Sequence, residues 1–294
     1  MFLNRGAAAL GGGSSLLQFQ LFRLKLIRSP QMQLPYSGKS SVEIISEAIR
    51  AKPSAALRRG HIWHIGNIAD LDSAGLYFAV GRTTTATVER YDPKAGNFVE
   101  ETFETAPYTH VLLDLDNQVV AIAAKPDLAP SVAGIARQIQ RLLDESPSAR
   151  DHEMSFELLE IKDPKDFITH LQTAYAVTRF TFMFSRPNPT DVNKDFVEPL
   201  ERFLTQVHGN HGNATVAGEN LDATVLEKVA KSAAATGDDA EVQIRSSASE
   251  RPIRKRLKSN PVTLKEKDPD TLEKKITLLS RIRALYIDVK AGIK

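Results

Sequence analysis

Short strand-like runs constrain the fold of this chain more than any other feature of its sequence. Five such runs fill most of the first half, at residues 16–28, 61–71, 75–91, 97–104 and 109–124. Runs of this length and composition, separated by turn residues, are typical of β-strands. The first half is therefore predicted to be strand-rich, with a mixed or antiparallel sheet.

The run at residues 16–28 changes phase in its middle. Its apolar positions are first Leu17, Phe19 and Leu21, and then Phe22, Leu24 and Leu26. A shift of one residue moves the apolar side chains to the opposite face of a strand, so the sequence predicts a β-bulge near this point. The preceding residues 1–15 end in glycines and serines, which favours a flexible segment.

Strands and helices alternate more regularly in the second half, where helical segments separate strand-like runs at 155–162, 177–184 and 240–246. Asp-Pro pairs at 163–164 and 268–269 provide the preferred chemistry for the start of a helix, and Ser131 is the expected N-cap of an earlier helix. The predicted fold class is α+β. Its predicted parts are the flexible segment 1–15, a strand-rich domain 16–150, and an alternating domain 151–294 with a basic loop at 245–267 and a C-terminal helix.

The composition of the 294 residues sets bounds on function. A hydrophobic share of 42% and a charged share of 25% are ordinary for a globular protein with room for about two domains. The absence of cysteine excludes disulfides, thiolate metal sites and cysteine nucleophiles. No apolar run approaches the roughly 20 residues of a membrane-spanning helix, so we expect a cytoplasmic protein with no membrane partner.

Charge is unevenly distributed although the formal net charge is only +2. Residues 1–60 carry 9 basic and 2 acidic side chains, residues 61–244 carry 15 and 28, and residues 245–294 carry 14 and 6. Two basic ends that flank an acidic middle indicate a polyanionic partner. The equally simple alternative is that the ends pair with the middle, within one chain or across a dimer.

The highest density of basic residues lies at 245–267. Six of them form the predicted nucleic-acid-binding site: Arg245, Arg251, Arg254, Lys255, Arg256 and Lys258. Gathered on one surface, these side chains would bind DNA or RNA phosphates with a marked salt dependence. If the first strand lies nearby, the site would extend to Arg23, Lys25, Arg28, Arg58 and Arg59. The alternative is a solvated loop that the acidic middle neutralises.

A metal-dependent nuclease is the main catalytic alternative. Glu160 and Lys162 close a strand with Glu-x-Lys spacing, and Asp144 or Asp151 lies upstream. In such a site two carboxylates hold Mg²⁺ and the lysine steadies the attacking water. A simpler interpretation is that Lys162 forms a charge pair with Asp163 at the entry to a helix.

Two further patterns resemble binding motifs. Gly38-Lys39-Ser40 resembles the end of a phosphate-binding loop, but Gln33 stands where that motif requires glycine, and a helix cap at Ser40 explains the same residues. The pairs His61/His64 and His208/His211 are spaced by three. The first lies in a strand-like run, where residues three apart point to opposite faces, and the second lies in the turn sequence HGNHGN. No metal or cofactor is therefore predicted, and catalytic residues stay unknown.

Phe180, Phe182 and Phe184 share one face of their strand. Stacking of bases on these rings is one interpretation, and a buried face packed against helices is the favoured one.

Several segments together resemble a known family. They are Phe180-Thr181-Phe182 followed by Arg186-Pro187-Asn188-Pro189, then Ala217-Gly218-Glu219, VAKSAAATGDDAEV, and Asn260-Pro261-Val262, with THVLLDLDNQVVAI further upstream. Over roughly residues 100–265 the chain resembles an uncharacterised family of bacterial proteins with a domain of unknown function (the DUF4747 type). The resemblance implies a cytoplasmic protein associated with phage defence and supplies no catalytic residues.

We therefore expect a nucleic-acid-binding or sensing component of a bacterial phage-defence or toxin–antitoxin-like system. The first alternative is the nuclease that uses Glu160 and Lys162. The second is a protein–protein scaffold that forms homo-oligomers or binds a partner protein of a defence system.

Overall fold

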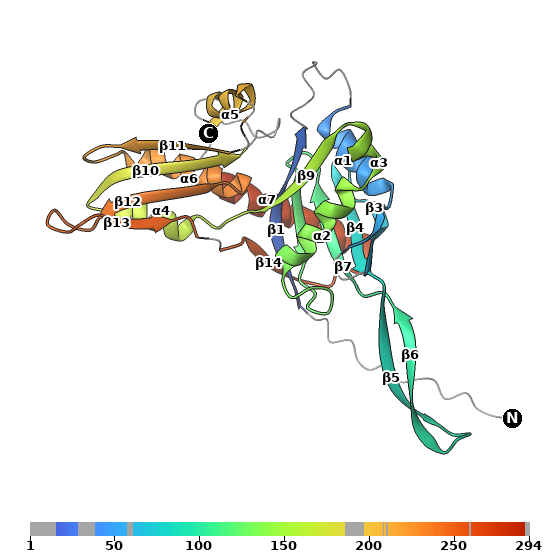
Figure 1. Cartoon of the computed structure of the whole chain (residues 1–294). Coiled ribbons are helices and arrows are strands. Elements are labelled where there is room, and N and C mark those ends of the chain that lie inside the picture. Colours follow the sequence, from blue (N-terminus) through green and yellow to red (C-terminus); the bar gives the residue numbers. More distant parts are fainter. Residues whose placement is uncertain are drawn as a thin grey trace.

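The computed structural model describes residues 16–28, 39–57, 61–185, 197–207, 209, 211–258 and 260–291. It has an α+β fold built on two sheets and a projecting hairpin, and every strand pairing in it is antiparallel (Figure 1). The expected fold class is confirmed.

The first sheet contains eight strands in the order β14-β1-β8-β7-β4-β3-β2, with β9 paired to β1 beside β14. The strands are β1 (Leu16–Arg28), β2 (Ser54–Ala56), β3 (Ile62–Asp70), β4 (Gly75–Arg82), β7 (Tyr108–Asp114), β8 (Val119–Ala123), β9 (Met154–Glu160) and β14 (Thr263–Lys267). Strands β9 and β14 follow residue 150 in the sequence. The first sheet therefore contains strands from both sides of the predicted domain boundary.

Helices cover both faces of the first sheet. On one face lie α1 (Ser41–Arg50), α2 (Val132–Asp144) and α3 (Pro147–Asp151), packed on a cluster that includes Phe22, Phe78 and Phe156. On the other face lies α7 (Leu272–Lys290), whose Leu279, Ile282 and Tyr286 pack against Phe19 and Leu21. Because the sheet is covered twice, its central strands are apolar on both faces.

Strand β1 pairs without interruption along its whole length, so the predicted bulge is wrong. The apolar residues change phase for another reason. Arg23 and Lys25 continue the face that begins with Phe19 and Leu21, and each of them is only 1% exposed. Lys25 Nζ lies 3.4 Å from Oδ1 of Asp238 in the second half of the chain. The face therefore turns from apolar to charged where it meets the rest of the molecule.

The second sheet has the order β11-β10-β12-β13. Its strands are β10 (Ala176–Ser185), β11 (His211–Ala217), β12 (Asp239–Arg245) and β13 (Ile253–Arg256), and its helices are α4 (Lys165–Thr173), α5 (Val197–Gln206) and α6 (Ala223–Thr236). Phe180, Phe182 and Phe184 are buried with α6 residues such as Val229 and Ala233. These phenylalanines therefore form a buried face, as the favoured interpretation predicts, and do not offer a stacking platform.

Two neighbouring segments connect the sheets. The chain leaves β9 and returns to β14 through residues that hydrogen-bond to each other, with Val262 N donating to Ile161 O at 2.9 Å and Asp163 N donating to Asn260 O at 2.7 Å. One continuous apolar cluster then joins α7, α6 and residues of both sheets, including Leu112 of the first and Val242 of the second. The sheets therefore share one of the two cores.

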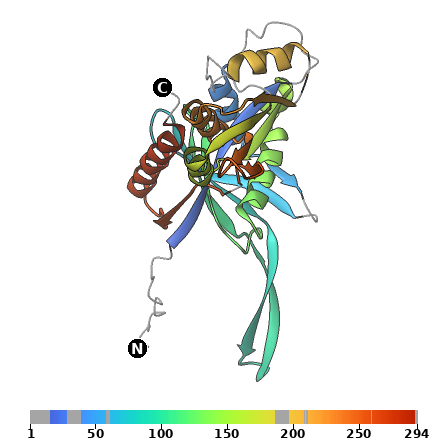
Figure 2. The same ribbon diagram turned by 90° about the vertical axis from the view of Figure 1, so that its left-hand side faces the viewer.

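The projecting hairpin consists of β5 (Thr84–Asp92) and β6 (Asn97–Thr105), and we call it the arm. It leaves the first sheet between β4 and β7 and extends away from the body in both views (Figures 1 and 2). Gly96 closes its turn with φ +64°, a conformation that favours glycine.

Helix starts follow the sequence signals with small shifts. Ser40 and Ser131 cap α1 and α2 as expected, and Ser40 forms a full capping box with Glu43. Helix α4 begins at Lys165, after Asp163 and Pro164, and α7 begins after Thr271 rather than at Asp268. None of the helices in the described residues is long and apolar enough to cross a membrane.

Candidate nucleic-acid interface

Residues 245–267 do not form the predicted basic loop. Ile253–Arg256 make β13 at an edge of the second sheet, and Thr263–Lys267 make β14 at an edge of the first. Polar, lysine-rich sequences suit edge strands, because charge there opposes unwanted pairing with other chains. The six predicted binding residues thus lie on the second sheet and just beyond it, whereas Lys265 and Lys267 of the same segment lie on β14.

We call the surface of the second sheet that points away from α4 and α6 the outer face. Strand alternation places Phe180 and Val242 on the helix-covered side and their neighbours on the outer side. The outer face carries Arg179, Thr181 and Met183 from β10, Asn213 and Thr215 from β11, Asp239, Glu241, Gln243 and Arg245 from β12, and Arg254 and Arg256 from β13. Asp239 lies 3.3 Å from Lys162 Nζ. None of the helices that the structure describes packs on the outer face.

Two arginines of the outer face hold one carboxylate. Arg256 Nε donates to Glu241 Oε2 at 2.8 Å, and Arg254 pairs with Oε1 of the same group. Hydrogen bonds from Arg254 and then Arg256 hold the pKa of Glu241 below its ordinary value. Both guanidinium groups are more than half exposed, whereas the Glu241 side chain is 10% exposed. Glu241 therefore orients two arginines toward solvent and neutralises only one of their charges.

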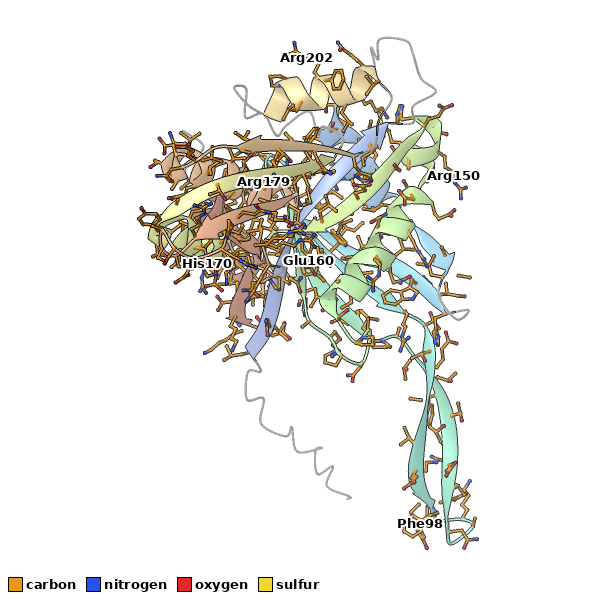
Figure 3. All side chains as sticks on the ribbon, turned by 60° about the vertical axis from the view of Figure 1, so that its left-hand side comes forward. Phe98, Arg150, Glu160, His170, Arg179 and Arg202 are labelled. Carbon is orange, nitrogen blue, oxygen red and sulfur yellow. The ribbon has the colours of Figure 1, made fainter. Side chains whose placement is uncertain are left out.

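Arg179 and Arg245 add further positive charge to this face. Arg179 is exposed in the centre of the sheet, as Figure 3 shows, and Arg245 is half-buried at the end of β12. Within the described part of the chain neither forms an ion pair, and Arg245 Nε has no hydrogen-bond partner. The outer face therefore has a net excess of arginine beside neutral hydrogen-bonding groups such as Thr181 and Thr215.

The structure separates the other predicted residues from this face. Lys255 points to the helix side of β13, opposite Val242, while Arg251 is exposed in the turn before β13. Lys255 and Lys258 line a groove of about 340 Å³ between β13 and α4, together with Asp163, Asp166 and His170, and Arg254 and Arg256 also border it. The groove therefore has mixed charge and meets the outer face along β13.

Arg23 and Lys25 of β1 do not extend the interface. Arg23 and Lys25 are buried inside the molecule, so that part of the predicted extension is wrong. They are buried because β1 is central in its sheet and because Asp238 lies opposite Lys25. Arg58 and Arg59 lie outside the described residues, as does the Arg186–Pro189 segment.

The proposed nuclease residues make other contacts. Glu160 Oε1 accepts a hydrogen bond from Gln20 at 3.0 Å, while Lys162 Nζ donates to Asp238 O at 3.0 Å and lies 3.3 Å from Asp239. Asp144 Oδ1 accepts from Phe156 N at 2.7 Å. Among the described residues no three His, Asp or Glu side chains gather around one point. These contacts give Glu160 and Lys162 a structural role at the junction of the two sheets.

The remaining motifs also have structural contacts. Lys39 pairs with Glu47 at 2.5 Å. His64 of β3 contacts Ser54 and Thr83, whereas His61 precedes that strand. Gly38, Gln33 and His208 lie outside the described residues.

Arg179, at the centre of the outer face, is not among the six predicted nucleic-acid-binding residues. A signal for it exists, because alternation in VTRFTFMF places Arg179 and Thr181 opposite the three phenylalanines. What the sequence does not show is that β10 lies beside β12, which brings Arg179 onto the same surface as Arg254 and Arg256.

Comparisons with protein-family models and with curated proteins find no match for this chain.

Proposed function

We propose that this protein binds single-stranded nucleic acid on the outer face of its second sheet. The observation that carries the proposal is the presence of Arg179, Arg245, Arg254 and Arg256 on one uncovered sheet face. Guanidinium groups bind phosphates through paired hydrogen bonds and also stack on bases. The setting in phage defence rests on the family resemblance and belongs to the same proposal.

The form of the surface supports a single strand over a duplex. A broad sheet face cannot enter a groove in the way that a helix or a two-stranded ribbon does. It can instead spread unpaired bases over its surface, while polar groups such as Thr181, Asn213 and Thr215 offer hydrogen bonds to base edges. The 3.0 Å contact between the Thr181 and Thr215 hydroxyls keeps this part of the surface flat and polar.

Alternation along β13 supplies a sharp test. Arg254→Ala and Lys255→Ala remove one charge each from adjacent positions, but only Arg254 lies on the outer face. We expect Arg179→Ala and Arg254→Ala each to weaken binding of a labelled single-stranded oligonucleotide by roughly 5- to 20-fold, and Lys255→Ala to change it little. Equal losses for Arg254→Ala and Lys255→Ala, or none for Arg179→Ala, would contradict the proposal.

The arm favours self-association as a second candidate function. Phe98 at its tip is 83% exposed, and Tyr91, Val88 and Phe103 are also exposed (Figure 3). Exposed apolar groups of this kind mark protein-binding surfaces. Residues 84–105 carry five acidic and two basic side chains, so the arm complements the arginines of a second copy.

Light scattering after size exclusion tests this second function at low and high salt. We expect a dimer at low salt that dissociates when Phe98 is changed to Ser, because the tip then loses its apolar anchor. Thr87→Ser, on the same arm, serves as the matched control. A monomer at all protein and salt concentrations would eliminate self-association and leave the nucleic-acid proposal untouched.

A further inference from the structure

A cavity of about 330 Å³ lies on the first sheet, away from the outer face of the second. It is enclosed by the end of β4, the start of β3, the loop before α2 and the first two turns of α2. Its volume is at the small end of the range for ligand sites in proteins. Cationic, polar and aromatic side chains line it.

Positive charge and free amide groups converge on this cavity. Arg82 lines it from β4, Arg137 lines it from α2, and His61 lies at its edge. Ser131 caps α2 by accepting from Gly134 N at 3.1 Å, which leaves the preceding two amides without a partner inside the helix. Helix N-termini carry partial positive charge, and arginine adds directed donors to it.

Two polar side chains that line the cavity each have one buried atom without a hydrogen-bond partner among the described residues. For Gln138, which is 7% exposed, this atom is Oε1. For Arg82 it is Nε, while Nη2 of the same side chain donates to the Asp127 carbonyl at 3.2 Å. A buried polar atom without a partner costs free energy, and a bound ligand removes this cost when it supplies the missing group. Gln138 therefore points to a ligand independently of the helix terminus.

These groups select among anions. Two arginines, a histidine and helix amides provide more donors than the two oxygens of a carboxylate require, whereas a phosphate group offers three acceptor oxygens and up to two charges. The indole of Trp63 also lines the cavity, and Leu128 and Ala129 add apolar surface. The lining therefore suits a phosphate that is attached to an organic group.

We propose that this cavity binds a small phosphorylated organic molecule, with Arg82 and Arg137 on the phosphate and Gln138 on the adjoining organic part. The site shares no residue with the outer face, so it does not depend on nucleic-acid binding. The two parts of the site can be tested separately. The arginines would bind the phosphate group, whereas the amide of Gln138 and the indole of Trp63 would contact the organic group.

Calorimetric titration of the full chain with adenosine monophosphate, inorganic phosphate and adenosine tests the site. We expect adenosine monophosphate to bind most tightly, inorganic phosphate more weakly, and adenosine not at all at millimolar concentration. Arg137→Gln should weaken nucleotide binding by roughly 10- to 100-fold, the usual value of a charge-assisted hydrogen bond. The matched control is Arg141→Gln, one turn later on α2 and outside the cavity.

Gln138→Met provides a second, independent test of the site, because it keeps the side-chain length and removes the amide with the unpaired oxygen. We expect it to lower nucleotide affinity several-fold and leave the affinity for inorganic phosphate unchanged, without lowering the midpoint of thermal unfolding. The proposal is overturned if neither phosphate compound binds at millimolar concentration, or if Arg141→Gln and Arg137→Gln have the same effect.

Discussion

At the scale of single residues, burial decides which of the charged side chains are available for binding. Arg254 and Arg256 are held by Glu241 but stay exposed, whereas Arg23 and Lys25 lie inside the molecule. The near-neutral net charge of +2 therefore combines internal pairs with a basic surface. Pairing within the chain therefore accounts for part of the uneven charge distribution.

The buried pair of Lys25 and Asp238 gives a stability prediction. Both side chains are almost completely buried, so Lys25→Met leaves the Asp238 carboxylate without its ammonium partner. We expect the free energy of unfolding to fall by roughly 3 to 5 kcal/mol, measured by urea denaturation. Lys274→Met breaks the exposed pair with Asp270 and should change stability little. Equal effects of the two substitutions would show that burial does not govern these pairs.

His110 gives a prediction about pH. Its Nδ1 lies 2.9 Å from the Tyr77 hydroxyl and its Nε2 3.3 Å from Asp268. Burial lowers the pKa of His110 below 6.5, against the opposing effect of Asp268, and Lys275 and Lys125 lower it further. The folded protein thus favours the neutral ring.

The sign of the effect follows from linkage. At a pH above about 6.5 neither state binds the proton, and the contribution of His110 to stability is complete. As the pH falls below this value the unfolded chain is protonated first, so stability decreases until the lower pKa of the folded state is passed. We expect His110→Gln to show a smaller loss of stability between pH 7 and pH 5 in thermal unfolding. An unchanged pH profile would mean that other groups cause the loss.

At the scale of elements, the sequence was sufficient to predict those helices and strands that a local signal determines. Ser40 and Ser131 predicted two helix starts, and the alternating phenylalanines predicted the buried face of β10. It was insufficient where partners lie far away in the chain. The bulge in β1 and the loop expected where β14 forms were wrong because strand pairing across more than 100 residues, which the local pattern does not contain, determines both regions. Strand β13 instead pairs locally with β12.

The arm is an element that we expect to be dispensable for folding. Its strands contact each other extensively, while its tip carries exposed rather than packed apolar residues. Replacing residues 86–103 with a two-residue Asn-Gly turn should leave the thermal midpoint within a few degrees of the original, since both cores are retained. A large loss of stability would show that the arm packs on the body. The same variant should be monomeric at low salt, where the original chain is expected to dimerise, if the arm mediates self-association.

At the scale of the whole molecule, the shared core predicts cooperative unfolding. Helices α6 and α7 join the two sheets in one apolar cluster, and the connecting segments pair with each other. We expect one thermal transition, with the fluorescence of Trp63, the single tryptophan, following the same curve as the far-ultraviolet circular dichroism. Two separated transitions would show that the sheets unfold independently.

The central claim is that the outer face of the second sheet binds nucleic acid, and the salt dependence of binding tests it most directly. Fluorescence anisotropy with a labelled single-stranded oligonucleotide would compare the original chain with the triple variant Arg179→Gln, Arg254→Gln, Arg256→Gln. The control is Lys265→Gln, Lys267→Gln, Lys274→Gln, which removes the same charge elsewhere on the surface. We predict that the outer-face variant loses at least tenfold in affinity and that the slope of log affinity against log salt decreases by about 2, with the control near the original value. Equal slopes and affinities for the two triple variants would contradict the account.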